Sequence, residues 1–229
     1  TASPALFRIQ DAGNNVVQIH GYSTSDLIGL FYPFEGMVSY AFTPDADGWV
    51  HICYQASSDG NARLFLGGVL VNTHSLGTWY APQVSVGGLA GNGTAFCTAY
   101  MDEFRYTNSI ERYSTAGFTP PVAAFPSNWN PTRTVLSLHA DSAPAFDSSC
   151  SLSPKTVTLV GAATVQSSVV KFDANAFYIP NTGNNGNGII VDLSYDLFFG
   201  TRDFTIDCWA YRTTHTNPGF LYAHYNAVA

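Results

Sequence analysis

The sequence carries little charge, and lysine is nearly absent from it. Asp, Glu, Lys and Arg make up 11% of the 229 residues, and the two lysines are Lys155 and Lys171. A soluble domain normally has about a quarter of its residues charged. The formal net charge is −7, so the chain has no basic stripe that could neutralise phosphates or anionic lipid head groups. We therefore expect no nucleic-acid partner and no binding to anionic membranes.

Long apolar runs are also missing. No stretch approaches the roughly 20 consecutive apolar residues of a membrane-spanning helix, so we expect no membrane insertion. Hydrophobic residues nevertheless make up 46% of the chain. This content is enough to bury one large core or two small ones, and it argues against disorder.

The four cysteines form no metal-binding cluster. Cys53, Cys97, Cys150 and Cys208 lie far apart, and no Cys-x-x-Cys or Cys/His group occurs. Such groups are the usual sequence signature of zinc, so their absence argues against a zinc site. Cys53 and Cys208 lie in strand-like runs, where cysteine usually behaves as a small buried hydrophobe. We expect free thiols.

Motifs of two hydrolase classes are missing as well. The glutamates are Glu35, Glu103 and Glu111, and none belongs to a Glu-x-Asp-x-x-Glu strand. That pattern would place the paired carboxylates of a glucanase on one strand face. No Gly-x-Ser-x-Gly elbow occurs, although a Ser–His–Asp triad stays open because its members meet only in space. We expect that the protein is not an enzyme.

Strand signals are abundant. Short runs rich in Val, Ile, Phe, Tyr and Thr recur about every ten residues between Gly, Asn, Asp and Pro clusters, which predicts an all-β sandwich or barrel. Residues 49–55, 62–66 and 69–71 are such runs, separated by Asp-Gly at 59–60 and Gly-Gly at 67–68. These dipeptides supply the positive φ angles of tight turns, so the sequence predicts two consecutive hairpins.

Two further segments shape the expected organisation. In residues 204–211, alternation predicts one face made of Phe204, Ile206, Cys208 and Ala210 and another of Asp207, Trp209 and Tyr211. Residues 118–134 hold four of the twelve prolines. Proline cannot donate to a strand ladder, so this segment is predicted to be a linker.

A weak internal repeat relates the two ends of the chain. Residues 218–227 can be laid on residues 4–13, since both are aromatic and apolar runs that enter an Asn/Asp/Ala/Gly turn. Two interpretations follow: a window cut from a longer tandem array, or one sandwich whose halves occur in permuted order. Each half alone would leave sheet edges unpaired.

Motifs in both halves carry a family resemblance. Those of the first half are at 48–52 (GWVHI), 61–71 (NARLFLGGVLV) and 100–106 (YMDEFRY), and those of the second are at 134–141 (TVLSLHAD), 146–149 (FDSS), 155–158 (KTVT), 170–172 (VKF) and 203–209 (DFTIDCW). Counted circularly, they resemble a laminin G-like domain of the concanavalin A-like lectin and glucanase superfamily. The resemblance implies that residues 1–117 form the C-terminal part of a sandwich, 118–134 a Pro-rich linker, and 135–229 the N-terminal part.

The resemblance also implies a calcium site and a virion context. In similar sandwiches an Asp at the position of Asp102 holds calcium against the opening loop, where Asp141 and Asp147 lie here. The alternative is that Asp102 caps a turn or pairs with Arg105 or another arginine. Residues 155–158 and 203–206 are similar to versions common in bacteriophage tail and capsid-associated proteins.

Aromatic residues suggest a second kind of site. Trp79 and Tyr80, flanked by Gly77 and Pro82, are the aromatic pair expected to be exposed. Such pairs can stack on sugar rings, although aromatics in a sandwich mostly fill the core. Trp49, Trp129 and Trp209 are open to the same two interpretations.

These observations combine into one expectation. The fold is a concanavalin A-like jelly-roll sandwich of antiparallel sheets, with the two halves in permuted order or from two tandem domains. The protein is expected to be a non-enzymatic structural or adhesion module of a virion, such as a phage tail fibre or capsid decoration. Its partners would be copies of itself, other virion proteins or host-surface glycans. The alternative is a secreted, extracellular carbohydrate-binding module of a bacterium.

Overall fold

The described part of the chain is built from β-strands. The computed structural model describes residues 7–10, 16–21, 27–32, 36–76, 83–87, 99–126, 133–141, 146–147, 149, 155–180, 187–191, 197, 202–213 and 219–220. These residues form seventeen strands and no α-helix, which confirms the all-β prediction. Within them, no helix has the length and hydropathy of a membrane span.

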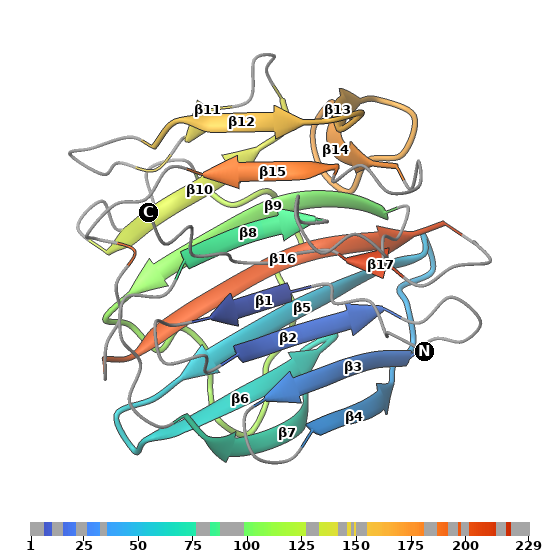
Figure 1. The fold of residues 1–229 in the computed structure, drawn as a ribbon. Coiled ribbons are helices and arrows are strands. Elements are labelled where there is room, and N and C mark those ends of the chain that lie inside the picture. The colour runs from blue at the N-terminus through green and yellow to red at the C-terminus, as the bar shows by residue number, and fades with distance from the viewer. Residues whose placement is uncertain are drawn as a thin grey trace.

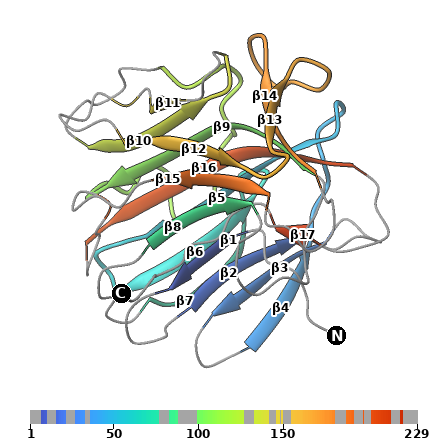
Figure 2. The ribbon, with the colours of Figure 1, turned by 45° about the horizontal axis from the view of Figure 1, so that its top comes forward.

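The strands form two antiparallel sheets that lie over one another as layers (Figure 1 and Figure 2). The eight-stranded sheet contains β1 (Phe7–Gln10), β2 (Val16–Gly21), β3 (Leu27–Tyr32), β4 (Gly36–Ala41), β8 (Gln83–Gly87), β12 (Val157–Val160), β15 (Gly188–Val191) and β17 (Gly219–Phe220). Its order is β12-β15-β8-β1-β2-β3-β4, and β17 pairs with β2.

The nine-stranded sheet forms the other layer. It contains β5 (Trp49–Ala56), β6 (Asn61–Leu66), β7 (Val69–Ser75), β9 (Ala99–Asn108), β10 (Thr134–His139), β11 (Phe146–Asp147), β13 (Thr164–Gln166), β14 (Ala176–Ile179) and β16 (Phe204–Arg212). Its order is β11-β10-β9-β16-β5-β6-β7, with β14 paired to β9 and β13 to β14. Strands β5, β6 and β7 form the two hairpins that the sequence predicts.

The two parts of the chain complete the same two sheets. Strand β16 lies between β9 and β5, so a strand of the second part separates two strands of the first. In the other sheet, β15 of the second part pairs with β8 of the first. This mutual pairing satisfies edges that either part alone would leave open.

A hydrophobic core fills the space between the layers. Its buried side chains come from both sheets and include Ile19, Leu30 and Ile189 of one and Ile52, Leu64, Phe104 and Leu136 of the other. In β16, Phe204, Ile206, Cys208 and Ala210 face this core, while Trp209 belongs to a second cluster with Tyr211 packed against it. The predicted division of residues 204–211 into two faces is therefore confirmed.

Strand β9 contains an irregularity that matters for the candidate site. Asp102 pairs with Trp209 and Arg105 with Asp207, so β9 has one extra residue opposite β16. The backbone φ of Glu103 is 55°, a left-handed value that is uncommon outside glycine. Met101 and Phe104 both reach the core. The bulge therefore places Asp102 and Glu103 together between two core-facing residues.

The Pro-rich segment packs against the nine-stranded sheet at Phe118 and Phe125. Residues 109–126, here called the strap, contain no strand. Thr134, the last residue of the predicted linker 118–134, already begins β10. The Phe118 amide donates to Gly68 O (3.0 Å), and the Phe118 ring stacks on Tyr113 at 3.7 Å between centroids. Phe125 is buried. The predicted linker thus acts here as a cover for the sheet.

Two of the four cysteines are described. Cys53 and Cys208 are buried free thiols, as predicted for these two. Burial raises the pKa of both thiols above the ordinary value, and the nearby Asp207 carboxylate adds to that increase. Burial and the raised pKa disfavour the reactive thiolate form of both groups. Cys97 and Cys150 lie outside the described residues.

Candidate functional site

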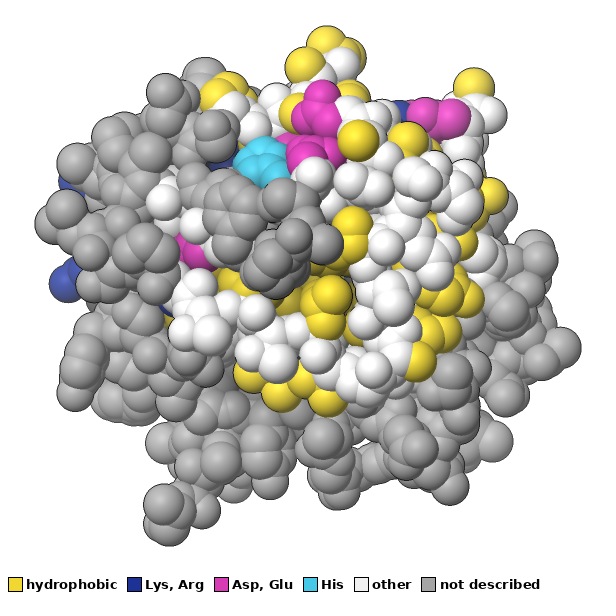
Figure 3. Space-filling view, turned by 90° about the horizontal axis from the view of Figure 1, so that it is seen from above, with side chains coloured by type: hydrophobic (Ala, Val, Ile, Leu, Met, Phe, Trp, Pro, Cys, Tyr) yellow, Lys and Arg dark blue, Asp and Glu magenta, His cyan; other side chains and the backbone are white. Residues whose placement is uncertain are grey.

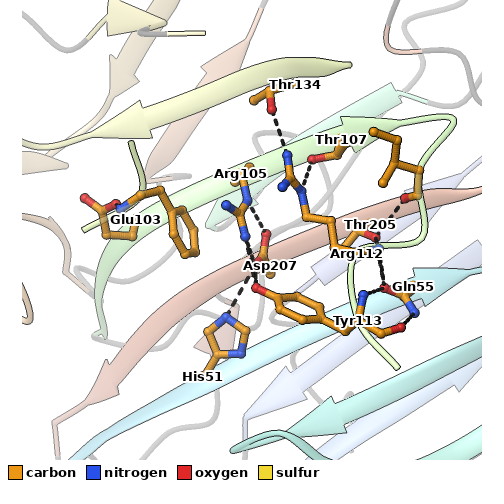
Figure 4. Close-up of polar contacts among 12 residues, drawn as sticks. His51, Gln55, Glu103, Arg105, Thr107, Arg112, Tyr113, Thr134, Thr205 and Asp207 are labelled. Atoms are coloured by element: carbon orange, nitrogen blue, oxygen red, sulfur yellow. Dashed lines mark hydrogen bonds and ion pairs between the residues drawn. The ribbon is translucent and has the colours of Figure 1, made fainter. Parts of the chain in front are cut away.

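The outer face of the nine-stranded sheet, which is turned away from the main core, concentrates the buried polar residues. Arg105 of β9, His51 of β5 and Asp207 of β16 lie on this face beneath the strap (Figure 4). They come from three adjacent strands and from both parts of the chain. Removing charges from water is costly unless they are paired, so their partners decide what this face can do.

Arg105 and Asp207 form a two-point ion pair. Arg105 Nε donates to Asp207 Oδ1 (3.0 Å), and Nη2 donates to Oδ2 (2.6 Å). The Tyr113 hydroxyl donates to Oδ2 at 2.6 Å, and His51 Nε2 lies 3.4 Å from Oδ2. Burial alone would favour the neutral acid, but Arg105 and His51 hold the pKa of Asp207 below its ordinary value. The carboxylate is therefore a fixed negative charge beneath the strap.

A second polar network ties the strap to the sheet. Gln55 Oε1 accepts the backbone N–H groups of Arg112 and Tyr113, both at 3.0 Å, and its Nε2 donates to Tyr113 O at 2.8 Å. The Arg112 side chain donates to Thr107 Oγ1 (2.6 Å) and Thr134 Oγ1 (2.8 Å). Burial, with a contribution from nearby Arg105, lowers the pKa of Arg112 to about 10. Figure 4 shows that both networks fasten the same segment.

Asp102, a predicted calcium ligand, holds a loop in this structure. It is 1% exposed, and its Oδ2 accepts the backbone N–H groups of Lys171 and Phe172, both at 3.1 Å. Burial raises the pKa of Asp102 to about 7, against those hydrogen bonds, and the Glu103 charge adds to the increase. Asp102 thus accepts backbone amides as a capping residue does, which is one of the two alternatives to calcium. The other alternative was a pair with Arg105 or another arginine, and Arg105 itself pairs with Asp207.

Asp147, the second predicted ligand, also accepts backbone hydrogen bonds. Its Oδ1 accepts the N–H groups of Ser137 (3.1 Å) and Ser149 (2.9 Å), and its Oδ2 accepts that of Lys155 (3.0 Å). Three amide donors on one buried carboxylate satisfy backbone groups that burial would otherwise leave unpaired. Asp147 therefore organises the segments on either side of β11.

Asp141, the third predicted ligand, joins a different group. Its carboxylate lies with Glu103 and His139, and one ligand atom from each residue falls within 4.8 Å of the others. His139 Nδ1 is 2.7 Å from Glu103 Oε1, and His139 Nε2 is 3.1 Å from Ser137 Oγ. Burial opposes protonation, but the Glu103 hydrogen bond and the carboxylate charges nearby raise the pKa of His139.

This is the group of possible metal ligands found among the described residues, and neither Asp102 nor Asp147 belongs to it. Figure 3 shows acidic and histidine side chains side by side at the surface seen from above. Sequence reasoning missed Glu103 and His139. His139 and Asp141 are two residues apart, which is the spacing of neighbours on one strand face, so the sequence contains a signal for this pair. The β9 bulge that supplies Glu103 has no sequence signal.

The aromatic candidates fall into two groups: those that are buried in the structure and those that lie outside the described residues. Trp49 and Trp209 are buried in the second cluster, with Phe172 and Tyr211 packed against it. Lys171 Nζ lies 4.1 Å from the Trp209 ring centroid. These two tryptophans therefore fill space between the sheet and its covering loop. Trp79, Tyr80 and Trp129 lie outside the described residues, so the sugar platform stays a prediction.

Comparison of the chain with family models, with curated proteins and with solved structures finds no match. The laminin G-like resemblance therefore rests on the motifs quoted above.

Proposed function

We propose that this chain is a non-enzymatic structural or adhesion module of a virion, with a concanavalin A-like jelly-roll fold in which the two halves occur in permuted order. The fold part is supported by the pairing of β16 with β5 and β9 and of β15 with β8. A permuted sandwich requires that the second part supply strands to both sheets of the first. The virion context is supported by the sequence resemblance.

The functional part of the proposal is carried by the hydrogen bonds that buried polar groups make on the outer face of the nine-stranded sheet. Arg105, Asp207 and Gln55 fasten the strap, and Asp102 fastens the loop at 171–172. Groups committed to such bonds stabilise a rigid covered surface, whereas catalysis needs groups that can reach a substrate. This arrangement favours a scaffold.

One group of described side chains resembles a catalytic triad. Ser137, His139 and Glu103 are hydrogen-bonded in the order of a Ser–His–acid triad. Ser137 is 2% exposed, however, and its backbone N–H is bonded to Asp147. A nucleophile needs access to a carbonyl carbon and nearby oxyanion donors, so the burial of Ser137 disfavours a hydrolase.

Mass in solution tests the structural proposal. Light scattering on the 229-residue chain should give a stable monomer or a defined multimer, because the two parts complete one another's sheets. Polydisperse aggregation that persists across solution conditions would mean that the parts need other chains, and it would contradict the permuted sandwich.

A glycan array then tests the adhesive role. Saturable binding that is lost in both Trp79→Ala and Tyr80→Ala would support adhesion, with Trp49→Phe as a control substitution at a buried tryptophan. Defined assembly without glycan binding would support a structural role and no adhesive one. Sugar release from the arrayed glycans would contradict a non-enzymatic module.

A further inference from the structure

Three side chains with different donor atoms converge at the junction of β9 and β10. Glu103 comes from the β9 bulge, His139 ends β10, and Asp141 follows two residues later. Their ligand atoms lie within 4.8 Å of one another. The set offers one imidazole nitrogen and two carboxylates; β9 and β10 hold Glu103 and His139, and the segment just after β10 holds Asp141.

The charge around this point is unbalanced. Asp102 and Glu103 are consecutive carboxylates, and each is 1% exposed. Among the described residues, the one ionic partner found for Glu103 is His139, and neither Asp102 nor Asp141 pairs with a lysine or arginine. Nearby Arg105 is committed to Asp207, and Lys171 to Asp45 and Asp47. The described part of this group therefore has a histidine but no lysine or arginine beside its carboxylates. Buried carboxylates are costly unless they are paired, so a positive ion would be stabilised here.

We propose that Glu103, His139 and Asp141 bind a divalent transition-metal ion of the zinc class, with water at the remaining position. Imidazole combined with carboxylate is a donor set that suits zinc and its neighbours, whereas calcium takes oxygen ligands. Three protein ligands and one water give the four-coordinate arrangement of an open zinc site.

The surroundings hold the ligands close to the required geometry. The Phe125 amide of the strap donates to Glu103 Oε2, which leaves Oε1 directed at His139. Ser137 Oγ contacts the other ring nitrogen of His139, as the outer-shell partners of metal-bound histidines do. Ligand atoms of a tetrahedral zinc site lie roughly 3.3 Å apart for bonds of about 2.0–2.1 Å. The Oε1–Nδ1 separation of 2.7 Å therefore has to open slightly as the ion replaces the shared proton.

Asp141 gives the ion access from solvent. It is exposed, and its Oδ1 accepts the Ala174 N–H at 3.2 Å, so the carboxylate is anchored at the surface. Glu103 lies beneath it and His139 is partly exposed. This site stands independently of the proposed module, because a scaffold and an enzyme could each use it.

Zinc titration of the full chain tests the proposal. Protein freed of metal by a chelator and then dialysed is titrated with Zn²⁺ at pH 7.5 in competition with a chromophoric chelator. We expect one equivalent to bind, with affinity reduced at least tenfold in Asp141→Asn and in His139→Gln. Zn²⁺ should also raise the unfolding temperature of the wild-type chain, because binding to the folded state alone stabilises it, and Ca²⁺ should not.

Asp173→Asn is the matched control. Asp173 is an exposed Asp one residue from Ala174 and outside the ligand group, and its φ of 53° suits asparagine. Asp173→Asn should bind Zn²⁺ like the wild type. Since Asp141 is exposed, Asp141→Asn should fold even if Glu103→Gln does not. Absence of stoichiometric uptake would overturn the proposal, and uptake that survives both ligand variants would overturn it by placing zinc elsewhere.

Discussion

Arg105 and Asp207 lie 102 residues apart in the chain and meet side by side on β9 and β16 through two hydrogen bonds of 3.0 and 2.6 Å. Each residue comes from a different part of the chain, and both side chains are at most 7% exposed. The pair therefore reports directly on whether the two parts are joined in one sheet.

Asp207→Asn should destabilise the fold strongly. The substitution leaves the Arg105 guanidinium buried beside a neutral amide, and removing one partner of a buried ion pair costs about 3–5 kcal/mol. Urea unfolding followed by tryptophan fluorescence measures the loss. Asp59→Asn is the control, since Asp59, the ionic partner of Arg63, is 45% exposed and its substitution should move the midpoint far less. Equal effects would show that the buried pair has no special role.

The same carboxylate predicts a loss of stability in acid. The pKa of Asp207 in the folded state lies below the ordinary value of about 3.9, so unfolding takes up a proton as the pH falls. Its stabilising contribution is complete above about pH 5 and is lost progressively as the pH falls toward the lower, folded-state pKa. Urea midpoints measured between pH 6 and 2 should fall more steeply for the wild-type chain than for Asp207→Asn. Parallel curves would contradict this account.

Gly67 and Gly68 form a matched pair that tests how the strap docks. Both have positive φ, 57° and 79°, in the turn between β6 and β7. A Cβ at Gly67 meets nothing within 4 Å, whereas at Gly68 it would lie 2.0 Å from Phe118 O. Gly67→Ala should cost roughly 1–2 kcal/mol from backbone strain alone. Gly68→Ala should cost about 3 kcal/mol or more because the strap has to move.

Thermal unfolding and limited proteolysis separate these two glycine effects. Proteolysis within the strap should accelerate in Gly68→Ala and stay unchanged in Gly67→Ala. Identical behaviour of the two variants would mean that the strap does not rest on the turn.

Asp102 allows the turn-capping role to be tested by comparing two substitutions. One oxygen, Oδ2, accepts both amide hydrogen bonds, so the carbonyl of Asp102→Asn can replace it. Asp102→Ala leaves the Lys171 and Phe172 amides without this acceptor, at a cost of about 2–3 kcal/mol. Chemical unfolding at neutral pH should therefore show Asn close to the wild type and Ala well below it. An equal loss of stability in both variants would mean that the charge is needed, as a cation ligand would require.

Much of the local structure could be predicted from the sequence. The alternation in residues 204–211 assigned Phe204 to the core and Trp209 to the opposite face, and both assignments agree with the structure. The hairpins of β5, β6 and β7 followed from Asp-Gly and Gly-Gly at the turns. These features depend on residues only a few positions apart, and so a pattern can reveal them.

The candidate site was only partly predictable for the same reason. Asp141 was predicted as a ligand. Glu103, however, lies 36 residues before His139 and reaches it through a bulge that no sequence motif predicts. Asp102 and Asp147 were chosen for their position in a resemblance, and in the structure their oxygens accept backbone amides. Whether a carboxylate contacts an amide or an imidazole depends on segments that are distant in the sequence and pack beside it in the fold.

The sequence by itself determined an all-β chain, the strand faces and the turns, because side-chain alternation and positive-φ glycines act through local stereochemistry. Only the tertiary structure decided that β16 separates β9 from β5, that the strap covers Arg105 and Asp207, and that Glu103 joins His139. Those relationships arise because distant strands must satisfy each other's edges and because buried charges must find partners wherever the packed chain brings them.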